Sequence, residues 1–517
     1  MKAYVNGFVN NIYEVKTLKK SVKRIIAAAL FAASILTFAA CQGGGNNPAG
    51  TTGGSKQTNT TDPADTEFIQ DEIPAGTDLG GVTVTMFWWQ DGTDGEFVNE
   101  GDGDGVDEAK YLRDAAVEER LKVKLRHIGK SYTWDTQGAY LDTIRASVKS
   151  GDATYDIVSG QYAIMPALII EGIYTDLIPL SKNSDGSNYL DFDKPWWLND
   201  IVKQTSVDGK MYLATGSITP MSIMQMFCIY GNEKLINDKK LENPCDIALR
   251  GEWTLDKLAE LTTNEWDDVD RDGTQSTGDY FGMVYPGSNY FKAYESALGI
   301  QMTTVNDDGT FEIACMNEKF NNCMDKLMQY INSAGWVKGP DGGPEYDIIY
   351  NSRALFWAGT FGDAAGRGLR DFSDGFYILP YPKYTADQEE YYTKLGEVNN
   401  LFGITSNSKN TTAAAAVMEC MASEGYRKVD QAFYEEGLKK KYNVADQSAQ
   451  MFDLIRKGMR FDFGSLYGTA LGFPFCTIKG YIYSDTATSW ASFCSRRVEQ
   501  AQEVLNDFYN AVKDLDT

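Results

Sequence analysis

The sequence predicts a large α/β protein with two lobes. Its 517 residues exceed what a single hydrophobic core organises, and 43% of them are hydrophobic, which is ample for folding. Between residues 81 and 160, short apolar segments alternate with helical ones, a pattern typical of parallel βαβ units. We expect the first 78 residues to lie outside this fold, because their composition differs.

Residues 1–40 have the features of a secretory signal. A basic patch at 19–24 precedes an apolar run at 25–38, and two alanines then lead to Cys41. This run is shorter than the roughly 20 apolar residues that cross a bilayer, so a cleaved signal is favoured over an ordinary membrane anchor. Lipoprotein processing acylates a cysteine in this position. We therefore expect a lipid on Cys41 that attaches the protein to the extracellular face of the cell membrane.

Residues 41–78 predict a flexible tether. They are mostly Gly, Asn, Thr, Pro and Asp, and such a segment cannot bury enough apolar surface to offset the entropy lost on ordering.

The elements of the first lobe follow in order from the apolar pattern. Residues 82–87 alternate apolar and polar side chains, as a strand with one buried face does. A helical stretch follows, and strands and helices then continue to alternate. The expected strands are 82–87, 122–128 and 155–158, and the expected helices are 108–121 and 140–149.

The second half of the chain is richer in helices. A strand pair is expected at 210–214 and 224–230, and helices dominate 254–330 around a short strand at 280–284. Two short apolar strands, 376–379 and 401–405, indicate that the chain returns to the first lobe. Residues 496–515 predict an amphipathic helix whose apolar face is Val498, Ala501, Leu505, Phe508 and Val512.

Charge and reactive residues exclude several classes of function. The net charge of −24 repels nucleic acid and anionic lipid, so no nucleic-acid partner is expected. Apart from Cys41, the cysteines are odd in number and lack CxxC spacing; buried single thiols are favoured over disulfides. The only histidine, His127, is expected on the surface or on an edge strand, which nearly excludes His-based zinc sites.

Six segments together resemble the extracellular solute-binding proteins of carbohydrate ABC importers, the maltose-binding-protein-like family. They are residues 155–158, 171–177, 208–212, 230–235, 252–255 and 378–383, and the resemblance spans residues 80–510. It implies a periplasmic-binding-protein-like fold, in which crossing hinge strands join two lobes and a ligand cleft lies between them. The implied lobes are 79–225 with 380–425, and 226–379 with 426–517.

The resemblance also implies a function without chemistry. A membrane-tethered receptor, expected to be a monomer, would capture a carbohydrate, expected to be an oligosaccharide, and deliver it to the permease of an ABC importer. Three alternatives remain open from the residues alone: a receptor for a non-sugar solute, an extracellular glycoside hydrolase using two carboxylates, and a structural surface protein or adhesin.

Candidate ligand residues combine flat rings with polar groups, because sugars present C–H faces and hydroxyl rims. In the first lobe, Trp88, Trp89 and Asp91 end the first strand, where open α/β sheets place ligands, and Gln161 and Tyr162 follow the strand at 155–158. One tryptophan of the pair is expected in the core, because neighbouring strand residues face opposite ways.

In the second lobe, two segments resemble ligand-facing parts of the family. One supplies Asn289 and Tyr290, and the other supplies Trp357 and Phe361, with Arg367 downstream. A core position is the alternative for each aromatic residue. Trp196 and Trp197 could pack in the lobe or line the cleft, and the sequence does not decide between these positions.

Residues 268–279 have the spacing of an EF-hand-like calcium loop. Oxygen-bearing side chains occupy positions 1, 3, 5, 7, 9 and 12, and Gly273 occupies position 6; the candidate ligands are Asp268, Asp270, Asp272, Thr274, Ser276 and Asp279. Asp279 replaces the usual glutamate at position 12, which predicts weak affinity. We expect a structural Ca²⁺ here, and an acidic solvated turn is the alternative.

Overall fold

A computed structural model describes the fold outside the N-terminal region. The described residues are 69–90, 96–97, 105–181, 188–198, 201–306, 308–340, 342–365, 369, 372–434, 447–472, 477–484, 486, 488–495 and 497–516. Contacts divide the chain into residues 1–62 and 63–517, and both lobes belong to the second unit. The predicted signal, most of the tether, Cys41, Asp91 and Arg367 lie outside the described residues.

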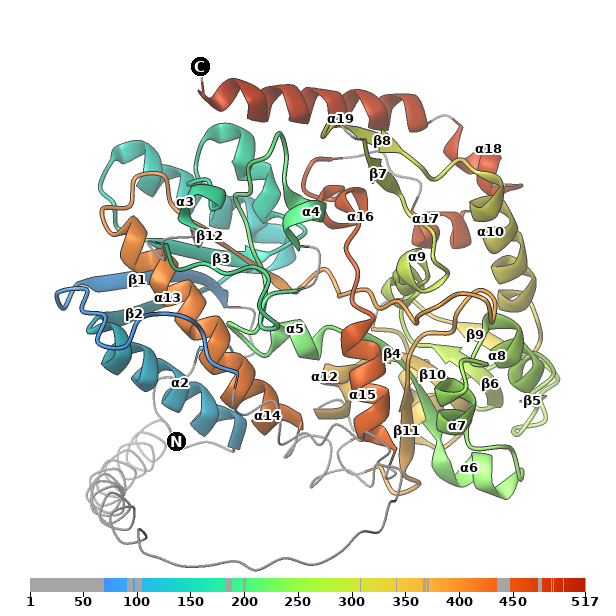
Figure 1. The fold of residues 1–517 in the computed structure, drawn as a ribbon. Helices are drawn as coiled ribbons and strands as arrows, with labels where there is room; N and C mark the ends of the chain where they lie inside the picture. The colour runs from blue at the N-terminus through green and yellow to red at the C-terminus, as the bar shows by residue number, and fades with distance from the viewer. Residues whose placement is uncertain are drawn as a thin grey trace, which may run out of the picture. The chain divides into compact units, whose positions relative to one another are not determined.

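The first lobe is built on a four-stranded sheet in the order β12-β3-β1-β2 (Figure 1). Strand β1 (Thr83–Gln90) runs parallel to β2 and β3, whereas β12 pairs antiparallel with β3. The remaining bounds are β2 Lys124–Ser131, β3 Ile157–Gln161, β12 Asn400–Ile404, α2 Gly105–Leu121, η2 Trp134–Thr136, α3 Gln137–Ser150, η3 Met165–Glu171, η4 Ile178–Leu180, α4 Ile201–Thr205, α13 Thr411–Glu424, the π-helix η6 Gly425–Val429 and α14 Asp430–Ala432.

Neighbouring residues of β1 enter two different hydrophobic cores, one on each face of the sheet, and helices cover both faces. Trp88 belongs to a core that includes Val117 of α2 and Val417 of α13. Trp89 faces the other way, into a core that includes Tyr140 of α3. The π-helix η6 and α14 continue from α13 and pack on α2, so the chain stays with the first lobe to the end of α14.

The second lobe is built on a mixed sheet in the order β11-β4-β10-β6-β5, with β9 also paired to β6. Helices pack on this sheet, whereas the separate β7–β8 hairpin packs on α16 and on α19 (Val498–Lys513). The bounds are α5 Met221–Met224, β4 Phe227–Asn232, α6 Glu233–Asp238, α7 Pro244–Leu249, α8 Leu255–Thr262, β5 Trp266–Asp267, β6 Tyr280–Tyr285, η5 Ser288–Ala293, α9 Tyr294–Ala297, β7 Thr303–Val305, β8 Phe311–Ile313, α10 Glu318–Ile331, β9 Trp336–Lys338, α11 Tyr346–Tyr350, β10 Ala354–Thr360, α12 Phe361–Ala365, β11 Phe376–Leu379, α15 Ser448–Lys457, α16 Phe463–Tyr467, α17 Ile478–Ile482 and α18 Trp490–Cys494.

Two chain segments cross between the sheets and pair with each other. The first crossing segment is residues 214–226, and the second is residues 393–402. Bridges join Ala214 to Phe402 and Met226 to Leu395, and the amide of Gly396 donates to the Gln225 carbonyl at 2.8 Å. A third segment lies along the second, because the Thr393 amide donates to the carbonyl of Gly458 at 2.8 Å. These contacts confirm the predicted α/β lobes joined by crossing strands.

The last long helix, α19 (Val498–Lys513), contacts both lobes (Figure 1). Gln502 accepts from the Ile313 amide at 2.9 Å and donates to the Phe311 carbonyl at 2.8 Å, which fixes the helix to β8. Towards its C-terminus, the Tyr509 hydroxyl donates to Asp208 of the first lobe at 3.2 Å. The predicted apolar face is confirmed, and a short 3₁₀ turn, η8 (Asp514–Asp516), follows.

Some predictions about individual elements were wrong. Strand β11 pairs with β4 of the second sheet, so only β12 returns the chain to the first lobe. Residues 210–214 form no strand, because only single bridges are made, from Lys210 to Val207 and from Ala214 to Phe402 of β12. The β7–β8 hairpin was missed, since three-residue strands carry too little alternation to detect.

The predictions for thiols and histidine agree with the structure where it describes them. Six cysteines (Cys228, Cys245, Cys315, Cys323, Cys420 and Cys494) are free and buried. His127 lies on the edge strand β2 and hydrogen-bonds Asp114 at 2.9 Å. Of the helices that the structure describes, none is both long and apolar enough to cross a membrane.

Trp196 and Trp197 are core residues of the first lobe, which settles what the sequence left open. Both are at most 1% exposed, and their indole N–H groups donate to opposite oxygens of Glu419 at 2.9 and 2.8 Å. The Asp191 amide donates to the same carboxyl group at 3.0 Å. Burial raises the pKa of Glu419 to about 8, although these three donors oppose the shift.

The raised pKa of Glu419 predicts a pH-dependent stability. The folded state keeps the proton when the unfolded state releases it, so this contribution is fully present below about pH 4.5 and is lost as pH rises to about 8. We expect the free energy of unfolding of the wild type, relative to a Glu419→Gln variant, to fall by up to about 1.4 kcal/mol per pH unit in this range. Urea denaturation from pH 5 to 8 measures it, and parallel pH profiles would contradict the prediction.

Candidate functional site

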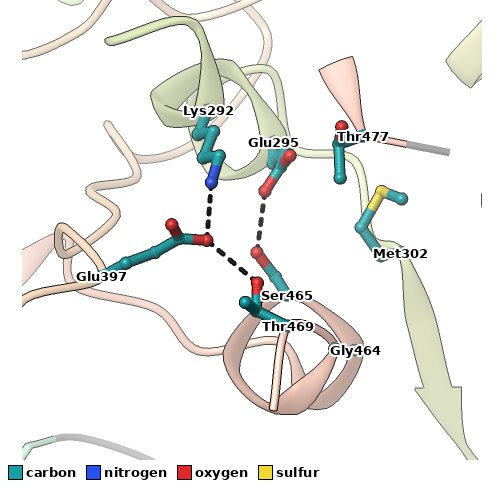
Figure 2. Close-up of a pocket in the computed structure, with 9 residues that line it drawn as sticks. Lys292, Glu295, Met302, Glu397, Gly464, Ser465, Thr469 and Thr477 are labelled. Atoms are coloured by element: carbon teal, nitrogen blue, oxygen red, sulfur yellow. Dashed lines mark hydrogen bonds and ion pairs between the residues drawn. The ribbon is translucent and has the colours of Figure 1, made fainter. Parts of the chain in front are cut away.

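A polar cavity of about 140 Å³ lies where the second lobe meets the crossing segments. Its walls come from η5 with α9, from the segment that leads into β12, and from α16 (Figure 2). The lining residues are Lys292, Glu295, Met302, Glu397, Gly464, Ser465, Gly468, Thr469 and Thr477. Three stretches far apart in the sequence therefore form one site.

Two ion pairs join the second lobe to the second crossing segment at this cavity. Lys292 and Glu295 are three residues apart on one side, and Lys394 and Glu397 have the same spacing on the other. Each lysine contacts the glutamate of the other segment, and we call these the exchanged pairs. The Lys292 ammonium lies 2.6 Å from Glu397, and the Lys394 ammonium lies 3.0 Å from Glu295. The local charge is therefore balanced within each pair.

Hydroxyl groups of α16 and the residues after it complete the polar network. The Ser465 hydroxyl donates to Glu295 at 2.8 Å and also accepts from the Lys394 ammonium. The Thr469 hydroxyl donates to Glu397 at 3.3 Å, and Figure 2 shows these groups converging. Hydroxyls thus lie beside both carboxylates.

The two pairs differ in exposure. The Lys394 and Glu295 side chains are 8% and 6% exposed, whereas those of Lys292 and Glu397 are 13% and 24% exposed. Burial alone would raise the pKa of Glu397, but the Lys292 ammonium outweighs it and holds that pKa below its usual value. Glu397 is therefore an ionised acceptor at neutral pH, open to the cavity.

Asp462 holds α16 in place beside the cavity. Its buried carboxylate accepts from the amides of Met302, Thr303 and Ser465 at 2.9, 3.0 and 2.9 Å. Burial raises the pKa of Asp462, and the amide donors oppose that shift. Because the contacts join α16 to β7, they fix the position of Ser465.

The predicted ligand residues of the first strand lie in the core. Trp88 is 5% exposed and meets Phe97 edge to face at 5.2 Å, and Trp89 is 3% exposed and meets Tyr140 at 5.1 Å. Both faces of this sheet are covered by helices, so both tryptophans are buried, where one had been expected in the core.

Tyr162 and Asn289 lie beside the cavity. Tyr162 lines a smaller adjoining hollow with Arg460 and Phe461, and its hydroxyl donates to the Leu395 carbonyl at 3.1 Å. Asn289 is on η5 with Lys292 and accepts from Lys479 at 2.9 Å. Gln161 is 5% exposed at the end of β3.

The other predicted residues of the second lobe are packed inside it. The Tyr290 hydroxyl hydrogen-bonds Asp363 at 3.2 Å, and Trp357 stacks on Tyr230 at 5.3 Å. Phe361 is 0% exposed and meets Phe452 edge to face. None of these three aromatic residues lines the cavity among the described residues.

Sequence reasoning missed the charged lining residues. The sequence prediction favoured aromatic rings at the ends of strands. The lining residues instead come from a short 3₁₀ helix, a crossing segment and a short helix. One signal was present: the repeated Lys-x-x-Glu spacing at 292–295 and 394–397, in segments otherwise rich in apolar and aromatic residues.

The predicted calcium loop connects β5 to β6. Carboxylate oxygens of Asp268, Asp270 and Asp279 all lie within 4.8 Å of one another. The backbone has positive φ at positions 4 and 6, with φ 61° at Arg271 and 79° at Gly273. Burial would raise the pKa of Asp279, but N–H donors from Ser276, Val269 and Trp266 hold it below its usual value, which keeps this buried carboxylate ionised.

The two ion pairs of the cavity predict unequal effects on stability. Lys394→Met leaves Glu295 buried without its cation and should destabilise the protein by about 3–5 kcal/mol. Lys292→Met leaves the more exposed Glu397 and should cost only about 1 kcal/mol. Adding Glu295→Met to Lys394→Met should recover most of the loss. Urea denaturation of the three variants measures this, and equal effects of the two lysine variants would contradict it.

Comparisons with known proteins support the fold. No protein-family model matches the chain, and no curated protein matches it. A cyclo/maltodextrin-binding protein complexed with maltotetraose matches over 83% of this chain and 96% of its own, with 11% identity and a TM-score of 0.51. A galacto-N-biose/lacto-N-biose I-binding protein of an ABC transporter from Bifidobacterium longum covers 85% and 98%, with 12% identity and a TM-score of 0.49. The first match confirms the two-lobed fold that the sequence segments implied.

Proposed function

We propose that the protein is a solute-binding protein that captures a carbohydrate and delivers it to an ABC importer. The observation that carries the proposal is a charge-paired cavity between the second lobe and one of the segments that cross to the first lobe. The cyclo/maltodextrin-binding protein of the same fold holds maltotetraose, which supports a sugar as the ligand class.

The chemistry of the lining suits hydroxyl groups. Sugar hydroxyls both donate and accept hydrogen bonds, and the cavity offers ammonium donors, carboxylate acceptors and hydroxyls that do both. Its volume of about 140 Å³ is below the roughly 300–1,000 Å³ of typical ligand sites. An oligosaccharide would therefore enter only when the lobes move apart, and their closure would then bury it.

The location and partners are part of the proposal. A lipid on Cys41 and the tether at 41–78 would hold the binding unit at the extracellular face of the membrane, as a monomer that passes its ligand to a permease. The matched solved structures are of binding proteins, and the proposal includes no catalytic step.

A binding experiment tests this function. The chain without residues 1–41 is screened by thermal shift and calorimetry against mono- and oligosaccharides. We expect one sugar class to stabilise it by about 2.7 kcal/mol at 100 times Kd, because the ligand binds only the folded state. Thr469→Val with Ser465→Ala should weaken binding at least tenfold, with Thr310→Val on the distant β7–β8 turn as the control.

Two outcomes would contradict the proposed function as a carbohydrate receptor. If no sugar in the screen binds, a non-sugar solute or an adhesive role becomes the better explanation. If chromatography shows that the sugar is cleaved, the protein is a hydrolase.

We also propose that the loop at 268–279 binds Ca²⁺ as a structural ion. The convergence of three carboxylates on a loop with the EF-hand spacing supports this. The ion would fix the connection between β5 and β6 at the edge of the second sheet.

Removal of calcium tests this site. We expect millimolar Ca²⁺ to raise the melting temperature and EGTA to reverse the rise, with Kd of roughly 10⁻⁴–10⁻³ M. Asp270→Asn should abolish the effect of Ca²⁺. Asp308→Asn, at the turn of the β7–β8 hairpin, is the matched control because it also removes an exposed carboxylate that caps a turn. A melting temperature that does not respond to Ca²⁺ would refute the site.

A further inference from the structure

We infer that the cavity selects neutral sugars and rejects acidic ones, and that the exchanged pairs Lys292–Glu397 and Lys394–Glu295 determine this specificity. The inference rests on the proposed function and names the substrate class of the same site.

The charges that line the cavity are balanced. The cations that line the cavity or its adjoining hollow are Lys292, Lys394 and Arg460, and each has a carboxylate partner, Glu397, Glu295 and Glu390 respectively. Lys479 hydrogen-bonds the Asn289 amide and is outside the described lining. A carboxylate on a sugar would therefore have to displace a carboxylate of the protein to gain a cation.

Displacement would be costly because the carboxylates remain. An acidic group next to Lys292 would stand beside Glu397, which already holds that ammonium at 2.6 Å and has a lowered pKa. Two like charges in a partly buried site repel each other strongly. The negative charge of the whole chain, −24, adds an unfavourable field for any anion that approaches.

The protein itself shows how a neutral hydroxyl fits between such a pair. The Ser465 hydroxyl donates to Glu295 at 2.8 Å while it accepts from the Lys394 ammonium, and the ion pair stays at 3.0 Å. A hydroxyl can do this because it is both donor and acceptor, whereas a carboxylate can only accept. The more exposed pair, Lys292–Glu397, offers the same arrangement to a sugar hydroxyl in the cavity.

A reversal of specificity tests the inference. Calorimetry compares neutral glucose, galactose and mannose oligosaccharides with glucuronate, galacturonate and mannuronate oligomers of matched length. We expect the wild type to bind a neutral oligomer at least tenfold more tightly than its uronate counterpart. Glu397→Gln keeps the shape but frees the Lys292 charge, so binding of the uronate should improve at least tenfold while that of the neutral sugar weakens.

A double variant provides the matched control. Lys292→Met with Glu397→Gln removes both charges, so it should bind the neutral sugar more weakly and show no gain for the uronate. Thermal melts confirm that both variants are folded.

The possible failures are distinguishable. A wild type that prefers the uronate, or a folded Glu397→Gln variant with no gain, overturns the inference while leaving the receptor function intact. A wild type that binds neither class overturns the proposed function and the inference with it.

Discussion

The antiparallel pairing of β12 with β3 is the interaction on which the junction depends. It extends from Asn400 opposite Gln161 to Ile404 opposite Ile157, and it anchors the returning chain in the first lobe. The residues just before β12 are thereby held against the second lobe, where Lys394 and Glu397 meet their partners. Lys394 and Glu397 lie only six and three residues before this strand, so the pairing fixes where the chain that carries them leaves the first lobe beside the cavity.

The exchanged ion pairs are better explained by function than by stability. Buried ion pairs seldom stabilise a protein more than apolar residues of similar size would, because the desolvation of two charges offsets their attraction. In this protein the ion pairs have two other effects. They make a polar surface without net charge, and they couple a helix of the second lobe to a crossing segment. Glu295 and Glu397 therefore connect the packing of the lobes to the chemistry of the cavity.

The fold was more predictable from sequence than the site. Strand β1 and helix α19 were found because alternation and helical periodicity are local signals. The pairing partner of β11 was missed, because a short apolar strand does not say which sheet it joins. The cavity was missed because segments 72 to 170 residues apart contact one another there. The aromatic residues that the sequence suggested are held in the core by helices that cover both sheet faces.

Helix α19 has a consequence for how the protein folds. Its side chains Leu505, Phe508 and Val512 complete a core that also contains Tyr140 and Ile169 of the first lobe. That core can therefore close only when the last residues of the chain are available, and contacts between distant parts of a sequence form slowly. Folding of this core is therefore delayed until α19 has been synthesised. Late folding of this kind is what passage through a membrane as an extended polypeptide requires, the route that an N-terminal secretory signal would impose.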